Sequence, residues 1–115
     1  MVGIQVITST QDNPLVASTI VSYTGSFLND LSAPRYMDWN PYYHVSPATV
    51  PTILFQGDAD IVVFKNQSQQ LQTVLNNNHV PDKLILYAKI FHDWWAVGNL
   101  VNNTLDETAA WFNKY

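Results

Sequence analysis

Residues 51–60, which read Pro-Thr-Ile-Leu-Phe-Gln-Gly-Asp-Ala-Asp, decide the fold that this chain can adopt. The apolar stretch 52–56 is entered from a proline and left at a glycine, and this pattern predicts a short buried strand. Residues 18–23 (STIVSY) and 83–88 (KLILYA) are equally short and apolar, and they predict two more strands. Because apolar residues run through these segments instead of alternating with polar ones, we expect a sheet that is covered on both faces.

Helical patterns follow the predicted strands at 52–56 and 83–88. Residues 65–77 predict a helix that ends at the asparagine run 76–78, with glutamines opposite an apolar face of Leu71, Val74 and Leu75. A capping box at 104–107 predicts the start of a last helix, with an apolar face of Leu105, Ala109 and Phe112. A strand–helix–strand crossover of this length predicts parallel strands. The sequence therefore predicts one α/β domain over residues 1–115, with three layers and a short, mostly parallel sheet.

The composition narrows the class of protein. Hydrophobic residues make up 47% of the 115 residues, so we expect a folded chain, and a net charge of -4 with scattered cations argues against nucleic-acid and membrane partners. Charged residues make up 12%, about half the usual share, which predicts that some apolar surface lies against another chain. The absence of cysteine excludes disulfides and thiolate metal sites. We expect no signal peptide, and no apolar run approaches roughly 20 residues, so the compartment is left unknown, with cytoplasmic as the default.

Two of the predicted strands end in residues that can carry chemistry. Asp60 follows the strand at 52–56, and His92 follows the strand at 83–88. The carboxyl ends of neighbouring parallel strands meet at one edge of a sheet, so we expect these two side chains to come within hydrogen-bonding distance. A carboxylate beside an imidazole fixes its tautomer and stabilises the imidazolium, so the pair would form two-thirds of a catalytic triad. Alternatively, Asp60 is a turn residue and His92 is an unrelated loop histidine.

Other polar and aromatic residues near this edge allow more than one interpretation. Asp58 could join the same pair in a metal site, but an aspartate-rich turn is more often a hydrogen-bonded loop end, and we expect neither metal nor cofactor. Ser22 and Ser26 fit turn or cap positions better than that of a nucleophile. Trp94 and Trp95 would either line an acyl pocket or fill the surface beside missing strands.

Residues 46–63 resemble the acid-bearing strand and turn of the α/β-hydrolases, among them esterases, lipases and prolyl-oligopeptidase-like enzymes. In that superfamily a strand ends in a glycine, an aspartate follows three residues later, and a valine-rich turn leads into a helix. The resemblance implies that Asp60 is the triad acid and His92 the triad histidine, that residues 20–27 form an earlier strand, and that residues 1–10 end the nucleophile helix. The chain departs from the usual pattern at three places: Gln56 replaces a histidine, Phe64 a proline, and Lys89-Ile90-Phe91 glycines.

The nucleophile motif of that superfamily, Gly-x-Ser-x-Gly, is absent from these 115 residues, whose glycines are Gly3, Gly25, Gly57 and Gly98. We expect the motif to end just before Met1. The resemblance then implies the C-terminal half of a hydrolase of carboxylic esters or related acyl bonds. This half would be inactive alone, because it keeps an acid and a histidine but needs a serine from elsewhere. The alternative is a binding or assembly module that kept the fold after losing the chemistry.

An incomplete sheet has a consequence for assembly. In the superfamily the strand at 18–23 would pair with a strand that precedes it, so here it would be an exposed apolar edge. Edge-to-edge pairing about a two-fold axis would cover that edge. We therefore expect a homodimer or higher homo-oligomer, with a small ester or acyl compound as the substrate.

Overall fold

The structure is a computed structural model that describes residues 37–38 and 40–115. Its strands are β1 (Thr52–Gly57) and β2 (Asp82–Tyr87), and its long helices are α3 (Lys65–Asn77) and α4 (Leu100–Lys114). Two 3₁₀ turns, η1 (Pro41–His44) and η2 (Trp94–Ala96), complete the described elements. The strand predicted at 18–23, the tail predicted at 1–10 and both candidate serines lie outside the described residues.

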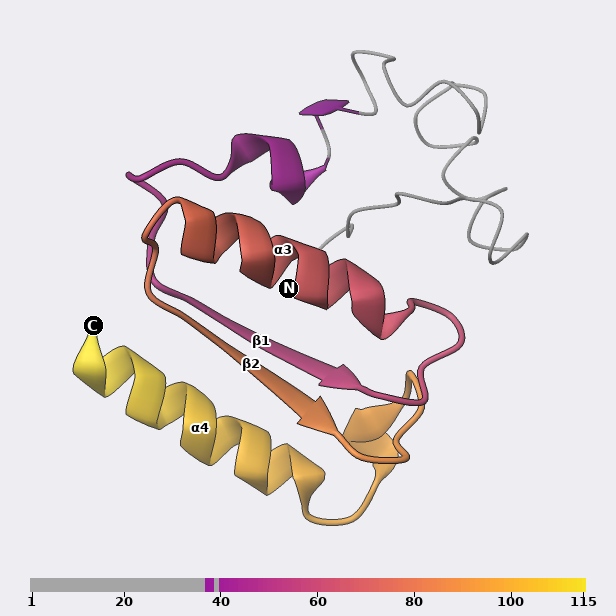
Figure 1. Ribbon diagram of the computed structural model, residues 1–115. Coiled ribbons are helices and arrows are strands. Elements are labelled where there is room, and N and C mark those ends of the chain that lie inside the picture. Colours follow the sequence, from indigo (N-terminus) through magenta and orange to yellow (C-terminus); the bar gives the residue numbers. More distant parts are fainter. Residues whose placement is uncertain (1–36, 39) are drawn as a thin grey trace.

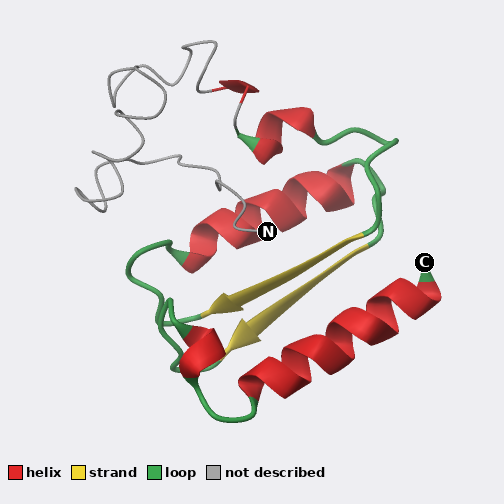
Figure 2. Cartoon of the chain, turned by 180° about the vertical axis from the view of Figure 1, so that it is seen from behind, coloured by secondary structure: helices red, strands yellow, loops and turns green. Residues whose placement is uncertain are grey.

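The two described strands pair in parallel, as the crossover predicted, in a register that runs from Thr52 beside Asp82 to Gly57 beside Tyr87. Helices α3 and α4 lie on opposite sides of this sheet, which gives three layers (Figures 1 and 2). The carboxyl ends of both strands emerge at the same edge, where the chain leaves β1 for α3 and β2 for η2 (Figure 1). The predicted α/β class with a short parallel sheet is confirmed for the described part of the chain.

Alternate residues of each strand face different helices, as the period of two in a strand requires. Gln56 faces α3, because its side chain accepts a hydrogen bond from the hydroxyl of Ser68. Tyr87 faces α4, because its hydroxyl contacts Asn103 Oδ1 at 3.0 Å and Thr104 Oγ1 at 2.7 Å. The neighbouring rings of Phe55 and Tyr87 stack with their centroids 6.4 Å apart on the α4 side. Side-chain hydrogen bonds therefore connect one face of the sheet to α3 and the other face to α4.

Helix α3 ends in a Schellman motif that has histidine where glycine is usual. The His79 N–H donates to Asn76 O and the Val80 N–H donates to Leu75 O, both at 3.0 Å. Val80 and Leu75 are both buried, which supplies the hydrophobic contact that accompanies this motif. His79 adopts a φ of 57°, a left-handed conformation that costs a residue with a Cβ about 1 kcal/mol.

We expect His79→Gly to raise the free energy of unfolding by about 1 kcal/mol, because glycine adopts this φ without a steric penalty. The measurement is the midpoint of urea unfolding. Asn78→Gly is the matched control, since Asn78 has a φ of -96° and donates from its side chain to Val74 O at 2.9 Å. That control should lower stability, and a His79→Gly variant no more stable than the parent would contradict the assignment of strain.

Three boundary predictions and one helix face need correction. Strand β1 ends at Gly57, one residue after the predicted 52–56. Strand β2 begins and ends one residue before the predicted 83–88. Helix α4 begins at Leu100, one turn before the predicted capping box, and no side chain caps it. Thr104 is therefore inside the helix, where its hydroxyl donates to Leu100 O at 2.8 Å. The capping-box prediction was wrong because this threonine satisfies its hydroxyl within the helix.

The predicted apolar face of α4 was also wrong. Leu105 and Phe112 are exposed, and the residue of α4 that is buried is Trp111. Thr104 and Thr108 share the packed face with this indole, and each hydroxyl bonds the carbonyl four residues earlier. Because these bonds satisfy the hydroxyls, threonines can occupy a packed face that the sequence pattern assigned to leucine and phenylalanine.

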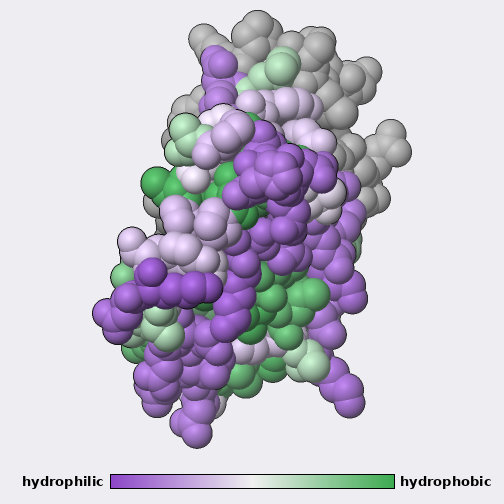
Figure 3. Space-filling model, turned by 60° about the vertical axis from the view of Figure 1, so that its left-hand side comes forward, coloured by the Kyte–Doolittle hydropathy of each residue, from purple (hydrophilic) through white to green (hydrophobic). Residues whose placement is uncertain are grey.

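The described residues enclose a small core, whose buried apolar members are Leu75, Val80, Tyr87 and Trp111. Large apolar side chains such as Val50, Phe91 and Phe112 are exposed, and apolar patches lie among hydrophilic ones on the face seen in Figure 3. None of the described helices combines the length and the hydropathy that crossing a membrane requires.

Candidate active site

An aspartate and a histidine meet beyond the carboxyl ends of the two strands. Asp60 lies in the turn after β1 and His92 in the loop after β2, and Asp60 Oδ2 is 2.8 Å from His92 Nδ1. The Asp60 carboxylate is buried, with 4% of its side chain exposed, whereas 36% of the His92 side chain is exposed. The structure thus brings together the two residues that the strand pattern placed at one edge. Their catalytic role stays a prediction.

Backbone hydrogen bonds join the turn that carries Asp60 (residues 58–63, the acid turn) to the loop that carries His92 (residues 88–93, the histidine loop). The Asp58 N–H donates to Tyr87 O at 3.0 Å, and the Ala59 N–H donates to Ile90 O at 3.1 Å. In return, the Lys89 N–H donates to the Asp58 carboxylate at 2.6 Å. The backbone and carboxylate of Asp58 therefore connect the two loops by hydrogen bonds, in agreement with its interpretation as a turn residue. Lys89 has a φ of 59°, which gives a physical reason for the glycines that the superfamily often has in this loop.

Gly57 lets the histidine loop cross the end of β1 at close range. A Cβ at this position would overlap the Ile90 carbonyl oxygen and lie 2.7 Å from the Phe91 carbonyl oxygen. The requirement is for space, and any side chain here would push away the loop that carries His92. The glycine that ends the predicted strand is thus needed by the site itself.

The Asp60 carboxylate accepts hydrogen bonds on both oxygens. Oδ1 accepts from the backbone N–H groups of Val62 and Val63, both at 2.9 Å. Oδ2 accepts from His92 Nδ1 and, at 3.4 Å, from Gln56 Nε2. These contacts fix the plane of the carboxylate and direct Oδ2 at the imidazole. With Nδ1–H donating to Asp60, Nε2 becomes the basic nitrogen of the neutral ring.

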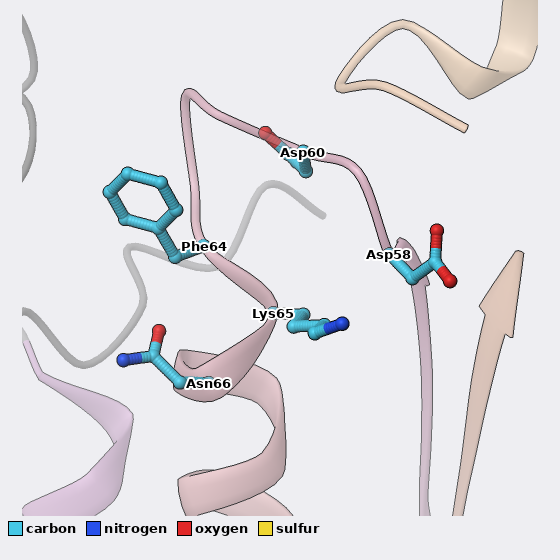
Figure 4. Close-up of a pocket in the computed structure, with 5 residues that line it drawn as sticks. All are labelled: Asp58, Asp60, Phe64, Lys65 and Asn66. Carbon is cyan, nitrogen blue, oxygen red and sulfur yellow. The ribbon is translucent and has the colours of Figure 1, made fainter. Parts of the chain in front are cut away.

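An open cavity of about 490 Å³ lies beside the acid turn, and it is lined by Asp58, Asp60, Phe64, Lys65 and Asn66. Lys65 extends from the start of α3 toward the strand end that carries Asp58, and Phe64 and Asn66 point to the other side (Figure 4). Among the described residues, no three His, Cys, Asp or Glu side chains are placed to hold one metal ion.

Trp94 packs against an aromatic residue of each strand. Its ring lies 6.0 Å from that of Tyr87 and 6.4 Å from that of Phe55, between centroids, so it packs over the end of the sheet.

Sequence reasoning missed two polar residues that support the acid, Gln56 and Ser68, which are both buried and hydrogen-bonded to each other. The available signal was a glutamine inside an otherwise apolar strand, directly before the glycine of the acid turn.

Parallel strands between two helices, with an acid and a histidine beyond their carboxyl ends, form part of an α/β-hydrolase fold. The family model of the prolyl oligopeptidase family matches residues 5–115, and the chain belongs to this family. The predicted superfamily is thereby confirmed. No curated protein and no solved structure matches the chain.

Proposed function

We propose that this chain supplies the acid and the general base of a serine hydrolase. His92 is the base and Asp60 holds it, while a serine from a segment or chain beyond these 115 residues is the nucleophile. The observation that carries the proposal is the 2.8 Å contact between Asp60 Oδ2 and His92 Nδ1. The bonds cleaved are carboxylic esters or related acyl bonds, and membership of the prolyl oligopeptidase family adds peptide bonds to that class.

The proposed mechanism follows from the tautomer. Asp60 accepts the Nδ1 proton, so Nε2 carries the lone pair that removes the hydroxyl proton from the serine as its oxygen attacks the acyl carbon. The imidazolium that forms is stabilised by the buried carboxylate and then returns the proton to the leaving oxygen or nitrogen. The same two transfers run again when water attacks the acyl-enzyme, so His92 is regenerated.

A second candidate function is a binding or assembly module without catalysis. One observation favours it: Lys89-Ile90-Phe91 stands where the superfamily often has glycines. In that case the contact between Asp60 and His92 serves only to join the two loops.

The test compares the 115-residue chain with a product extended by whatever in-frame coding sequence lies upstream of Met1. Both are assayed with a p-nitrophenyl ester, a prolyl p-nitroanilide and a serine-reactive fluorophosphonate label. We expect turnover and labelling only in the extended product. Turnover by the 115-residue chain that is lost in its His92→Ala variant would refute an external nucleophile. An inactive, unlabelled product that contains the serine motif would favour the binding module.

We also propose that the chain self-associates, which rests on the low share of charged residues and on the apolar segment 18–23. We expect a homodimer or higher homo-oligomer at micromolar concentration in size-exclusion chromatography with light scattering. Ile20→Lys, which places a charge in that segment, should lower the fraction of oligomer. A parent chain that elutes as a monodisperse monomer would contradict the proposal.

A further inference from the structure

A buried glutamine and a buried serine connect the acid turn to helix α3. Gln56 is 3% exposed and Ser68 is 1% exposed. The Gln56 amide donates to Asp60 Oδ2 at 3.4 Å and to the Val63 carbonyl oxygen, and it accepts from the Ser68 hydroxyl. We propose that Gln56 is a positioning residue for the Asp60 carboxylate and that Ser68 fixes the orientation of Gln56. The proposal rests on the function proposed above for Asp60 and His92.

The orientation of this amide follows from its neighbours. On one side it faces two acceptors, a carboxylate oxygen and a carbonyl oxygen, so its NH₂ group must point that way. On the other side it faces the Ser68 hydroxyl, which can donate to Oε1. A flipped amide would place Oε1 against the carboxylate and leave a buried NH₂ group beside the serine. Such an arrangement leaves buried acceptors without donors, which is costly.

The amide holds the acid turn at two points. Asp60 lies within the turn and Val63 closes it, and Gln56 Nε2 donates to an oxygen of each. The contact with Oδ2 is long for a hydrogen bond, so it acts mainly by directing the amide dipole at the carboxylate. The contact with Val63 fixes the backbone whose N–H groups hold Oδ1. Gln56 thus stabilises the carboxylate plane that keeps Oδ2 against His92 Nδ1.

Ser68 anchors the amide to a rigid element. It lies in the first turns of α3, and its hydroxyl reaches back to the strand that precedes the helix. Rotation of the Gln56 side chain would break this bond in a place where water cannot replace it. The position of the acid is therefore set by strand, turn and helix together.

Imidazole ¹⁵N spectroscopy of the 115-residue chain tests the proposal without any need for turnover. The parent should show His92 with a proton on Nδ1 that exchanges slowly with water. Gln56→Met removes the polar contacts and keeps a side chain of similar length. We expect its Nδ1 proton to exchange about threefold faster, the factor that one weak hydrogen bond is worth. Ser68→Ala should change the same signal in the same direction and by less.

Gln72→Met is the matched control, because Gln72 Nε2 donates to Asp82 Oδ1 at 2.7 Å at the far end of the sheet. It removes a similar contact and should leave the His92 signals unchanged. Equal changes in both variants, or none in Gln56→Met, would overturn the proposal. If Gln56→Met fails to fold, Ser68→Ala decides, and unchanged His92 signals there overturn it. Where the extended product is active, Gln56→Met should lower kcat and leave KM unchanged, whereas an inactive product with altered His92 signals would refute only the proposed function.

Discussion

The Asp60→Asn substitution should lower kcat by about ten-thousand-fold, with the fold intact, in an extended product that is active as proposed above. The reason lies in the two backbone N–H groups of Val62 and Val63, which both donate to Oδ1. These donors require the amide oxygen of an asparagine at that position, so its NH₂ group must face His92. Nδ1 would then accept a hydrogen bond, the ring proton would move to Nε2, and the base could no longer accept a proton there.

Asp82→Asn is the matched control, since Asp82 begins β2 at the opposite end of the sheet and accepts a hydrogen bond from Gln72. It removes the same charge and should leave kcat within about threefold of the parent. Circular dichroism verifies that both variants fold, and imidazole ¹⁵N shifts report the tautomer. A loss of less than about tenfold in Asp60→Asn would show that the acid does not set the tautomer of His92 during turnover.

Much of the fold could be predicted because several local signals agreed. The bounds of α3 were predicted correctly, since its apolar residues have helical spacing and the asparagine run 76–78 marks its end. The contact between Asp60 and His92 required only the rule that neighbouring parallel strands end at one edge. Neither inference depends on how far a helix is rotated about its axis.

The rest could not be predicted because it depends on helix rotation. The face of α4 was misplaced, since Trp111 and the threonines beside it pack inward while Phe112 stays exposed. Gln56 and Ser68 lie 12 residues apart, and their contact exists only because α3 turns that serine toward the sheet. The assembly predicted from residues 18–23 remains a prediction, because that segment lies outside the described residues.

Among substitutions that add one methyl group near the site, Gly57→Ala should disrupt the site most. The added Cβ would overlap the Ile90 carbonyl oxygen, and a second carbonyl oxygen lies 2.7 Å away. Both atoms belong to the backbone of the loop that carries His92, so they can yield only if the loop moves. We expect a loss of about 1–3 kcal/mol in the free energy of unfolding, the usual cost of overpacking. We also expect the 2.8 Å contact between Asp60 and His92 to break.

Gly98→Ala is the matched control, because it adds backbone strain without a steric clash. A Cβ at Gly98 would meet nothing within 4 Å, but the residue has a φ of 50°. That control should cost about 1 kcal/mol through strain in the left-handed region, and the His92 imidazole signals should stay as in the parent. The measurements are urea unfolding and the ¹⁵N spectrum of His92. Unchanged His92 signals in Gly57→Ala would mean that the loop can shift without carrying the histidine, so that the acid turn and the histidine loop are not one rigid unit. Altered signals in Gly57→Ala alone would show that the bare backbone of this strand end is what holds the imidazole against the acid.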